Sequence, residues 1–315
     1  MISKEEFEQY LKEIDTSGYE AEIKKENKKG NIAFYVCLGV AFAIITAAVI
    51  YIMTKHVYQI WYLVLFGLPI FTFGFVLKAY FNNKILKQFD GKYRNQFIAK
   101  LLEGYEYTYE RDAFISPQIY TRSHFSSTGD DYTGQDLLTI TIPNKNGEKT
   151  NTKISFCDLH IVEYHRVRDN DGTTRTETIT LYAGVFAYAE FQESFKCNMA
   201  INTTLYDKAA RLVQLEDINF NKKLRTYSND QLEVRYILTP DMMQKLLKLA
   251  NMSSMVKLKF VGKEAFMGLK FNLFEPTKLK KGVSLSETYI SLYDDVAFIL
   301  KIVEELSKNS KVFKI

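Results

Sequence analysis

The 315-residue sequence predicts an α+β protein: a two-helix transmembrane hairpin near the N-terminus, followed by a cytosolic mixed α/β domain with an antiparallel sheet. Three observations predict this fold class. Two long stretches, residues 31–53 and 57–77, contain no charged residue. Residues 137–201 hold segments rich in Ile, Thr, Val, Phe and Tyr with stretches of alternation, as in strands. Residues 284–306 repeat apolar residues at helical spacings.

These patterns divide the chain into four parts. We expect an N-terminal cytosolic amphipathic helix over residues 1–30, the transmembrane hairpin over 31–77, a basic juxtamembrane helix over 78–104 and a cytosolic α+β domain over 105–315. The last part contains no linker rich in Pro, Gly or Ser and no clear internal repeat. At about 210 residues it is long enough to bury a core without metals or disulfides.

The two uncharged stretches are 23 and 21 residues long. As helices they would measure roughly 34 and 31 Å, which is about the thickness of a bilayer's hydrocarbon core. A signal peptide would start near residue 1 and would not be followed by a second apolar run. A pair of buried core helices would keep a polar stripe, which neither stretch has. Two membrane spans therefore explain the pattern best.

The short segment Thr54-Lys55-His56 between the spans predicts the tip of the hairpin, with aromatic residues around it as at a membrane interface. Ten Lys and Arg residues lie within about 20 residues of the outer ends of the spans, whereas the tip has only Lys55. The positive-inside rule then places both termini and the main domain in the cytoplasm, in a multi-pass protein of the cell's inner membrane. The ten basic residues are Lys12, Lys24, Lys25, Lys28 and Lys29 before the spans, and Lys78, Lys84, Lys87, Lys92 and Arg94 after them.

Small residues mark one face of each predicted span. Gly39, Ala43 and Ala47 recur every four residues in the first span, and Gly67 and Gly74 are seven apart in the second. Small faces let helix backbones approach closely in lipid. They favour packing of the two spans on each other, and the alternative is a seam between copies in a homo-oligomer.

The flanking helices are amphipathic or basic. Phe7, Leu11 and Ile14 share a face of the N-terminal helix, which is interrupted near Ser17-Gly18. Residues 78–100 hold six basic residues and one acidic residue, so this helix can contact anionic lipid or serve only as a stalk. The candidate lipid-surface residues are Lys24, Lys25, Lys28, Lys29, Lys78, Lys84, Lys87, Lys92 and Arg94.

In the large domain, Ser116-Pro117 predicts a helix start. Strands follow over 137–143, 152–167, 174–191 and 196–201, with a hairpin turn at 169–172. Thr239-Pro240-Asp241 opens a second helix, residues 255–274 form another hairpin, and the pair Ser284 and Glu287 forms a capping box for the closing helix.

The sequence offers little catalytic chemistry. Motifs for nucleotide binding, hydrolase nucleophiles and zinc proteases are absent. Cys157, Asp158 and His160 have zinc-ligand residue types, but no second ligand pair exists elsewhere. The cluster Asp130, Asp131 and Asp136 is either an acidic loop, which is commoner, or a cation site. We expect no catalytic, cofactor or metal residues and no cofactor. Nucleic-acid binding has little support because the net charge of +4 is mostly juxtamembrane.

Several stretches in order resemble the bacterial family called domain of unknown function 3137. They are "DDYTGQD" (130–136), "KISFCDLHIVE" (153–163), "LYAGVFAYAEFQESFK" (181–196), "TYSNDQLEVRYILTPDMMQKLLKLA" (226–250) and "LFEP" (273–276). The resemblance implies an integral bacterial membrane protein without catalytic residues that could be carried over. It also implies, as a partner, a LemA-like membrane protein.

These observations lead to one main hypothesis and two alternatives. The main hypothesis is a non-enzymatic, membrane-anchored scaffold or sensor whose cytosolic domain binds a protein, a peptide or a lipid headgroup. The first alternative is a ligand-regulated membrane effector that oligomerises through its hairpin. The second is an enzyme with dispersed catalytic groups, such as the aspartates of residues 128–136.

Overall fold

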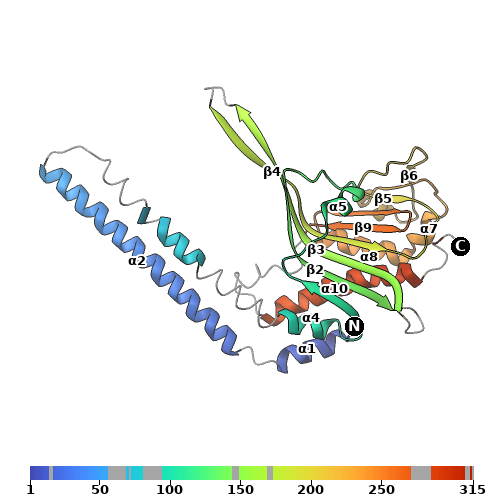
Figure 1. The fold of residues 1–315 in the computed structure, drawn as a ribbon, viewed down its shortest axis with the longest axis horizontal. Helices are drawn as coiled ribbons and strands as arrows, with labels where there is room; N and C mark the ends of the chain where they lie inside the picture. The colour runs from blue at the N-terminus through green and yellow to red at the C-terminus, as the bar shows by residue number, and fades with distance from the viewer. Residues whose placement is uncertain are drawn as a thin grey trace. The chain divides into compact units, whose positions relative to one another are not determined.

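The computed structural model describes residues 1–13, 17–55, 69–70, 72–80, 94–143, 149–168, 173–270, 285–308 and 313. The chain divides into two compact units. The helical unit comprises Ile2–Leu101 with Val283–Ser286, and the sheet unit comprises Leu102–Gly282 and Glu287–Ile315 together with Met1. Each unit is described by itself below (Figure 1).

Two short helices of the helical unit carry buried apolar residues. In α1 (Lys4–Glu13), Ser3 and Glu6 form a reciprocal cap: the Glu6 N–H donates to Ser3 Oγ at 3.2 Å, and the Ser3 N–H donates to Glu6 Oε2 at 2.9 Å. Helix α4 (Asn95–Leu101) buries Phe97, Ile98 and Leu101. The rings of Tyr10 and Phe97 meet edge to face at 6.4 Å, so the two helices pack together.

Helix α2 (Ser17–Lys55) is continuous through both the lysine-rich segment and the first predicted span. Within the part of the chain that the structure describes, it is the one helix long and apolar enough to cross a membrane, with its apolar window at Lys28–Ala47. Most of the second predicted span, residues 57–68 and 71, lies outside the described residues together with His56. The two-helix hairpin therefore stays a prediction.

A second helical segment, residues 72–80, packs on α2. Gly74 is buried there, and a Cβ atom added to it would lie 3.0 Å from Cys37 Cβ. The rings of Phe34 and Phe75 meet at 4.8 Å, and Lys78 Nζ lies 5.3 Å from the Phe34 ring centroid. The absence of a side chain at Gly74 is what lets the two helices approach this closely.

The sheet unit is built on one nine-stranded sheet in which every neighbouring pair is antiparallel. The strand order is β1-β2-β3-β4-β9-β8-β5-β7-β6. The strands are β1 (Glu106–Glu110), β2 (Asp131–Pro143), β3 (Lys149–Arg168), β4 (Thr174–Glu190), β5 (Met199–Ile201), β6 (Arg211–Val213), β7 (Thr226–Ser228), β8 (Val256–Val261) and β9 (Glu264–Leu269). The predicted mixed α/β domain with an antiparallel sheet is thus confirmed.

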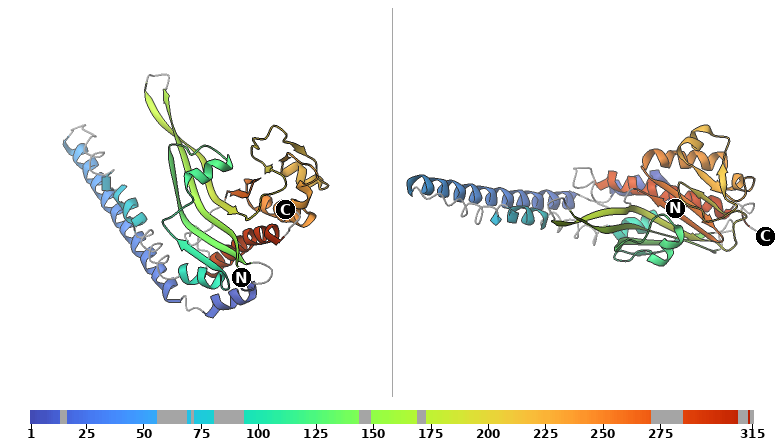
Figure 2. Two further views of the ribbon diagram at one scale, coloured as in Figure 1. Left: turned by 45° about the vertical axis from the view of Figure 1, so that its right-hand side comes forward. Right: turned by 90° about the horizontal axis from the view of Figure 1, so that it is seen from above.

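Strands β3 and β4 form the long hairpin that the sequence predicts, with pairing that runs from Lys153↔Glu190 to Arg168↔Thr174. The turn at 169–172 lies outside the described residues. The outer part of this hairpin extends past the neighbouring strands as a two-stranded ribbon (Figures 1 and 2). Residues 174–180 are exposed on both faces of the ribbon, which therefore adds nothing to the core.

Helices cover both faces of the sheet. The sheet unit contains α5 (Pro117–Ser123), α6 (Ile218–Lys223), α7 (Val234–Ile237), α8 (Pro240–Met252) and all but the first two residues of α10 (Leu285–Lys308). The predicted starts of α5 and α8 are confirmed: Ser116 and Thr239 are the N-cap residues, each followed by proline. In α8 the cap is a hydrogen bond of 3.2 Å from the Met242 N–H to Thr239 Oγ1.

Helix α10 packs on one sheet face through the apolar residues that the sequence predicts for a docked helix. All of them are buried, namely Leu292, Val296, Ile299, Val303 and Leu306. A small apolar gap of about 20 Å³ lies between α10 and the sheet. It is lined by Ile302 and Val303 from the helix and by Ile154 and Ala187 from the strands, among others.

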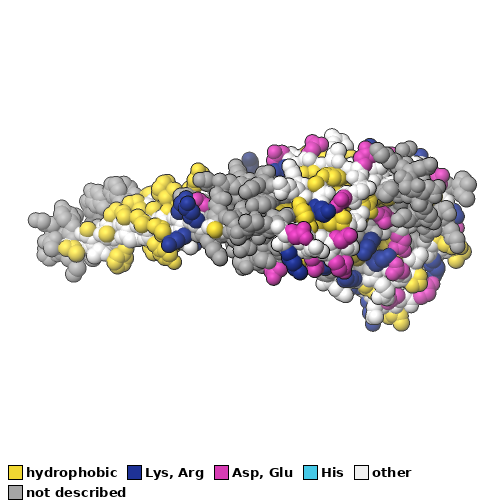
Figure 3. Space-filling model, turned by 90° about the horizontal axis from the view of Figure 1, so that it is seen from below, with side chains coloured by type: hydrophobic (Ala, Val, Ile, Leu, Met, Phe, Trp, Pro, Cys, Tyr) yellow, Lys and Arg dark blue, Asp and Glu magenta, His cyan; other side chains and the backbone are white. Residues whose placement is uncertain are grey.

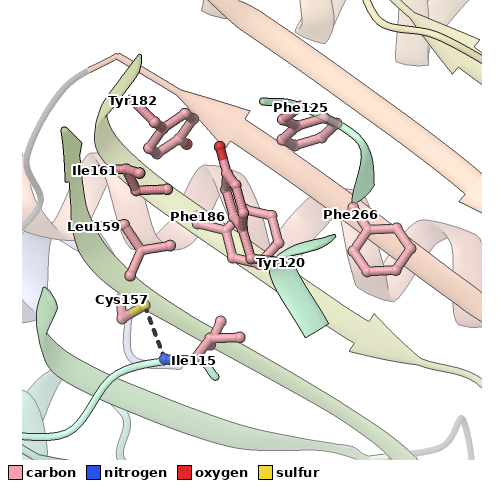
Figure 4. Close-up of a cluster of buried hydrophobic side chains, with 9 residues drawn as sticks. All are labelled: Ile115, Tyr120, Phe125, Cys157, Leu159, Ile161, Tyr182, Phe186 and Phe266. Carbon is pink, nitrogen blue, oxygen red and sulfur yellow. Dashed lines mark hydrogen bonds between the residues drawn. The ribbon is translucent and has the colours of Figure 1, made fainter. Parts of the chain in front are cut away.

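Helix α5 packs on the opposite face, over odd-numbered residues of β3 such as Cys157 and Leu159. The ring of Tyr120 lies against Phe186 at 4.9 Å and against Tyr182 at 5.5 Å (Figure 4). Because side chains alternate along a strand, the even-numbered residues of this part of β3 point to α10 instead. The sheet unit is therefore a helix–sheet–helix sandwich with an aromatic core under α5.

One glycine sets how closely β4 and β9 approach. Gly184 has φ +149°, and a Cβ atom there would lie 2.1 Å from the Leu269 carbonyl oxygen. Gly184→Ala should therefore lower the free energy of unfolding by about 2–4 kcal/mol, because the strands must separate. Denaturant unfolding of the detergent-solubilised protein, followed by the near-ultraviolet circular dichroism of its tyrosines, measures this.

Gly262→Ala is the matched control. Gly262 has φ +60° but no atom within 4 Å of an added Cβ, so only backbone strain of about 1 kcal/mol is expected. Equal losses for the two variants would show that close strand approach at Gly184 is unimportant.

Candidate functional site

A cleft of about 340 Å³ with polar groups in its lining lies at the end of α5. Its walls are the C-terminal end of α5, the hairpin β8–β9 and the segment 198–207. This volume falls in the range of small-molecule sites, about 300–1,000 Å³. The lining residues are Thr121, Arg122, His124, Asn198, Leu205, Tyr206, Asp207, Lys259, Val261, Glu264 and Phe266.

Strand alternation places two lysines of β8 under the end of α5. Leu258 and Phe260 line the gap beside α10, so Lys257 and Lys259 point to the opposite face. Lys257 Nζ donates to the Phe125 carbonyl at 2.5 Å, and Lys259 Nζ donates to the Arg122 carbonyl at 3.0 Å. Both lysines thereby bind carbonyl groups at or just beyond the C-terminus of α5, where the helix dipole favours positive charge.

Lys259 lines the cleft, although only 4 % of its surface is exposed. Among the described residues it forms no salt bridge, since the nearby Glu264 binds other groups. Glu264 Oε1 lies 2.8 Å from Arg122 Nη2 and accepts a hydrogen bond from the Tyr188 hydroxyl at 2.9 Å. Burial lowers the pKa of Lys259 to about 8, against the opposing attraction of Glu264. A strongly perturbed ionisable group in a cleft is a mark of functional sites.

His124 and Tyr206 form the mouth of the cleft. His124 follows α5 in the left-handed region, with φ 57°, and its ring meets that of Tyr206 edge to face at 4.6 Å. Its carbonyl accepts a hydrogen bond from Thr203 Oγ1 at 3.2 Å, which fixes the segment 198–207 against α5. Burial, and then the charge of Lys259, lower the pKa of His124. His124 therefore faces the cleft mainly as the neutral imidazole at neutral pH.

The aspartates singled out in the sequence do not gather. Asp136 is buried at a bulge of β2, where the Tyr109 hydroxyl donates to its Oδ1 at 2.5 Å. Asp130 is exposed and accepts the Tyr164 N–H at 2.8 Å, and Asp131 is exposed where it pairs with Val162. The described residues contain no group of three His, Cys, Asp or Glu that could hold a metal ion. The aspartate cluster therefore gives no support to a cation site or a catalytic site.

Cys157 has a structural role in the core. It is fully buried, and its Sγ accepts a hydrogen bond from the Ile115 N–H at 3.3 Å (Figure 4). Burial raises the pKa of the thiol to about 12. The thiolate that metal binding or nucleophilic attack would need is therefore absent at neutral pH.

Four of the five residues predicted for helix packing are described, and they divide into two groups. Gly74 packs against Cys37, as described above, whereas Gly39, Ala43 and Ala47 lie on an exposed part of α2. Gly67 lies outside the described residues.

The predicted lipid-surface residues are only partly described. Lys25, Lys28 and Lys29 are exposed on α2, and Lys29 also pairs with Glu26. Lys24 also lies in α2, Lys78 stacks on Phe34, and Lys84, Lys87 and Lys92 lie outside the described residues. Arg94, just before α4, is 4 % exposed.

Comparison with known proteins connects the sheet unit to a family. Residues 180–308 match the family described as "Protein of unknown function (DUF3137)". This segment belongs to the DUF3137 family. The match runs from within β4 to the end of α10, so it includes Lys259 and Glu264 of the cleft but not α5 or the helical unit. The resemblance to this family that the sequence suggested is thereby confirmed. The match does not reach the two predicted membrane spans, which it therefore does not test.

Other comparisons add little to the DUF3137 assignment. No curated protein matches the chain. A solved structure, "crystal structure of the mycobacterial trehalose monomycolate transport factor A, TtfA", is 10 % identical and has a TM-score of 0.33. The match covers 67 % of this chain and 96 % of that chain. A TM-score this low supports no argument about fold or function.

The cleft was not predicted from the sequence. The one sequence signal for it is "VKLKF" at 256–260, in which two lysines alternate with apolar residues on a strand. Such alternation usually indicates a solvated strand face. The sequence does not show that α5, more than 130 residues earlier, covers this face and buries Lys259.

Proposed function

We propose that the chain is an integral membrane protein whose sheet unit acts as a non-enzymatic binding module, a scaffold or a sensor. The helical unit holds this module at the inner membrane of a bacterium. The cleft beside Lys259 receives the ligand, which is a protein segment, a peptide or a lipid headgroup. A LemA-like membrane protein is the partner that the family resemblance suggests.

The exposure of α2 carries this proposal. Only 11 % of the apolar window Lys28–Ala47 is buried, whereas the core helix of a soluble protein is mostly buried. Phe42 is 71 % exposed, and Figure 3 shows hydrophobic side chains along the surface of the helical unit. Seven large apolar residues of the window are exposed, which in water would cost roughly 10 kcal/mol in lost burial. A lipid environment removes that cost.

Two further observations support a hairpin that crosses the membrane twice. Cys37 lies 18 residues before Lys55, and its contact Gly74 lies 19 residues after Lys55. A contact at nearly equal distances on either side of Lys55 fits two antiparallel helices joined near that residue. Lys78 of the second helical segment stacks on Phe34, and Phe34 comes five residues after Lys29 in α2. Lysines from both helices therefore lie at the same end of the pair. The positive-inside rule assigns this end to the cytoplasm.

Cysteine labelling in intact cells tests the membrane topology. Lys55→Cys should react from outside with a membrane-impermeant maleimide, because the hairpin tip faces away from the cytoplasm. Lys301→Cys, on the exposed side of α10, should react only after lysis. The native cysteines give little background, since Cys157 and Cys197 are buried and Cys37 lies in the apolar helix. Labelling of both positions from outside, or of neither, would refute the proposed topology.

A second candidate function is a ligand-regulated effector that oligomerises through the helical unit. It is favoured by the exposed ladder of Gly39, Ala43 and Ala47, which the described part of the second helix leaves open. Small residues at this spacing allow close contact between helices of two copies.

Ala43→Leu tests this candidate, since a larger side chain would hold the two helices apart. The oligomer should be lost in size-exclusion chromatography with light scattering in a mild detergent. Ile45→Leu is the control, because it conserves volume on the same exposed helix. An oligomer that survives Ala43→Leu unchanged would exclude this seam.

A further inference from the structure

We infer that the cleft beside Lys259 binds the anionic group of a small organic ligand, a carboxylate or a phosphate, with Lys259 Nζ as the main donor. This inference rests on the proposed function, because it names the ligand class of the proposed binding site. It is carried by the position of one buried cation and by the charges around it.

Lys259 is a buried cation that forms no salt bridge with any residue that the structure describes. Its ammonium carries three N–H donors, and one of them binds the Arg122 carbonyl. No carboxylate lies within ion-pair distance of it among the described residues, and the backbone carbonyl carries no net charge. A buried ammonium in this position is costly, and an anion that enters the cleft would offset the cost.

The neighbouring charged groups are bound to other partners, so the place of a counter-ion beside Lys259 Nζ is left to a ligand. Arg122 and Glu264 neutralise each other at 2.8 Å, and Glu264 is held further by Tyr188. Asp207 also lines the cleft, and its Oδ1 accepts a hydrogen bond from the Ala209 N–H at 2.9 Å. Lys257, on the same strand, is turned to the Phe125 carbonyl and does not line the cleft. His124 at the mouth can donate a hydrogen bond to an anion but carries little charge at neutral pH.

The remaining walls favour an organic body on the anion. Tyr206, Val261 and Phe266 present apolar surface next to Lys259. A cleft of about 340 Å³ is much larger than a bare ion needs and matches a ring or a headgroup. The expected ligand therefore combines one anionic group with an apolar or aromatic part.

Benzoate and benzamide are matched probes, because they share size and shape but differ in charge. Ligand-observed NMR with the full-length protein in a neutral detergent should show binding of benzoate and phenyl phosphate, and at least tenfold weaker binding of benzamide. Lys259→Met should weaken benzoate binding at least tenfold. Lys257→Met, which removes the neighbouring lysine but no cleft donor, should change it less than twofold. Melting curves of both variants verify that they are folded.

The pH dependence of benzoate binding needs no variant. Benzoate keeps its charge between pH 7 and 9.5, so a change in affinity reports on the protein. The pKa of Lys259 is about 8, so at lower pH its side chain is already an ammonium and the affinity for benzoate should be constant. At higher pH the amine must take up a proton when benzoate binds, so the affinity should fall by up to about tenfold per pH unit. Lys259→Met should abolish this dependence.

Three results would overturn the inference: equal binding of benzamide and benzoate, unchanged benzoate binding in Lys259→Met, or equal losses in Lys257→Met and Lys259→Met. Each would leave the membrane topology untouched, because cysteine labelling tests that topology separately. Displacement of phenyl phosphate by phosphatidylglycerol in nanodiscs, but not by glycerol 3-phosphate, would identify a lipid headgroup as the source of the anion. The reverse result would identify a soluble phosphate ester.

Discussion

The exposed apolar surface of α2 is the constraint on which the rest of the molecule depends. Over Lys28–Ala47 the helix presents side chains such as Val36, Val40 and Phe42 outward, and no other described part of the helical unit covers them. Water cannot accommodate such a surface without a large free-energy cost, whereas hydrocarbon can. The membrane attachment that we propose rests on this helix, and the orientation that we propose rests on the lysines at one end of its apolar window.

In the sheet unit the corresponding constraint is the burial of a charged group, Lys259, away from water. Alternation along β8 turns Leu258 and Phe260 to α10 and Lys257 and Lys259 to α5. The end of α5 supplies carbonyl groups for both lysines but a carboxylate for neither. A buried ammonium that is bound to a carbonyl, and to no carboxylate within ion-pair distance among the described residues, is incompletely compensated. The anionic ligand that we propose for this cleft would supply the missing negative charge.

Much of the fold could be predicted from the sequence because the signals are local. The helix starts at Ser116-Pro117 and Thr239-Pro240, the β3–β4 hairpin and the apolar face of α10 each depend on residues close in sequence. The sheet order could not be predicted, since β9 and β8 insert beside β4 from far along the chain. The cleft could not be predicted for the same reason: Arg122 and Lys259 meet only through that order.

The depth of α2 in a bilayer tests the central claim most directly. Spin labels placed singly at Ile32, Val36, Val40 and Ile45, with Cys37 replaced by alanine, would be measured by electron paramagnetic resonance in liposomes. If α2 lies in the bilayer, all four labels should collide more with oxygen than with a water-soluble nickel complex, most strongly near the middle of the window. Labels that collide mainly with the nickel complex would place α2 in water and contradict the account.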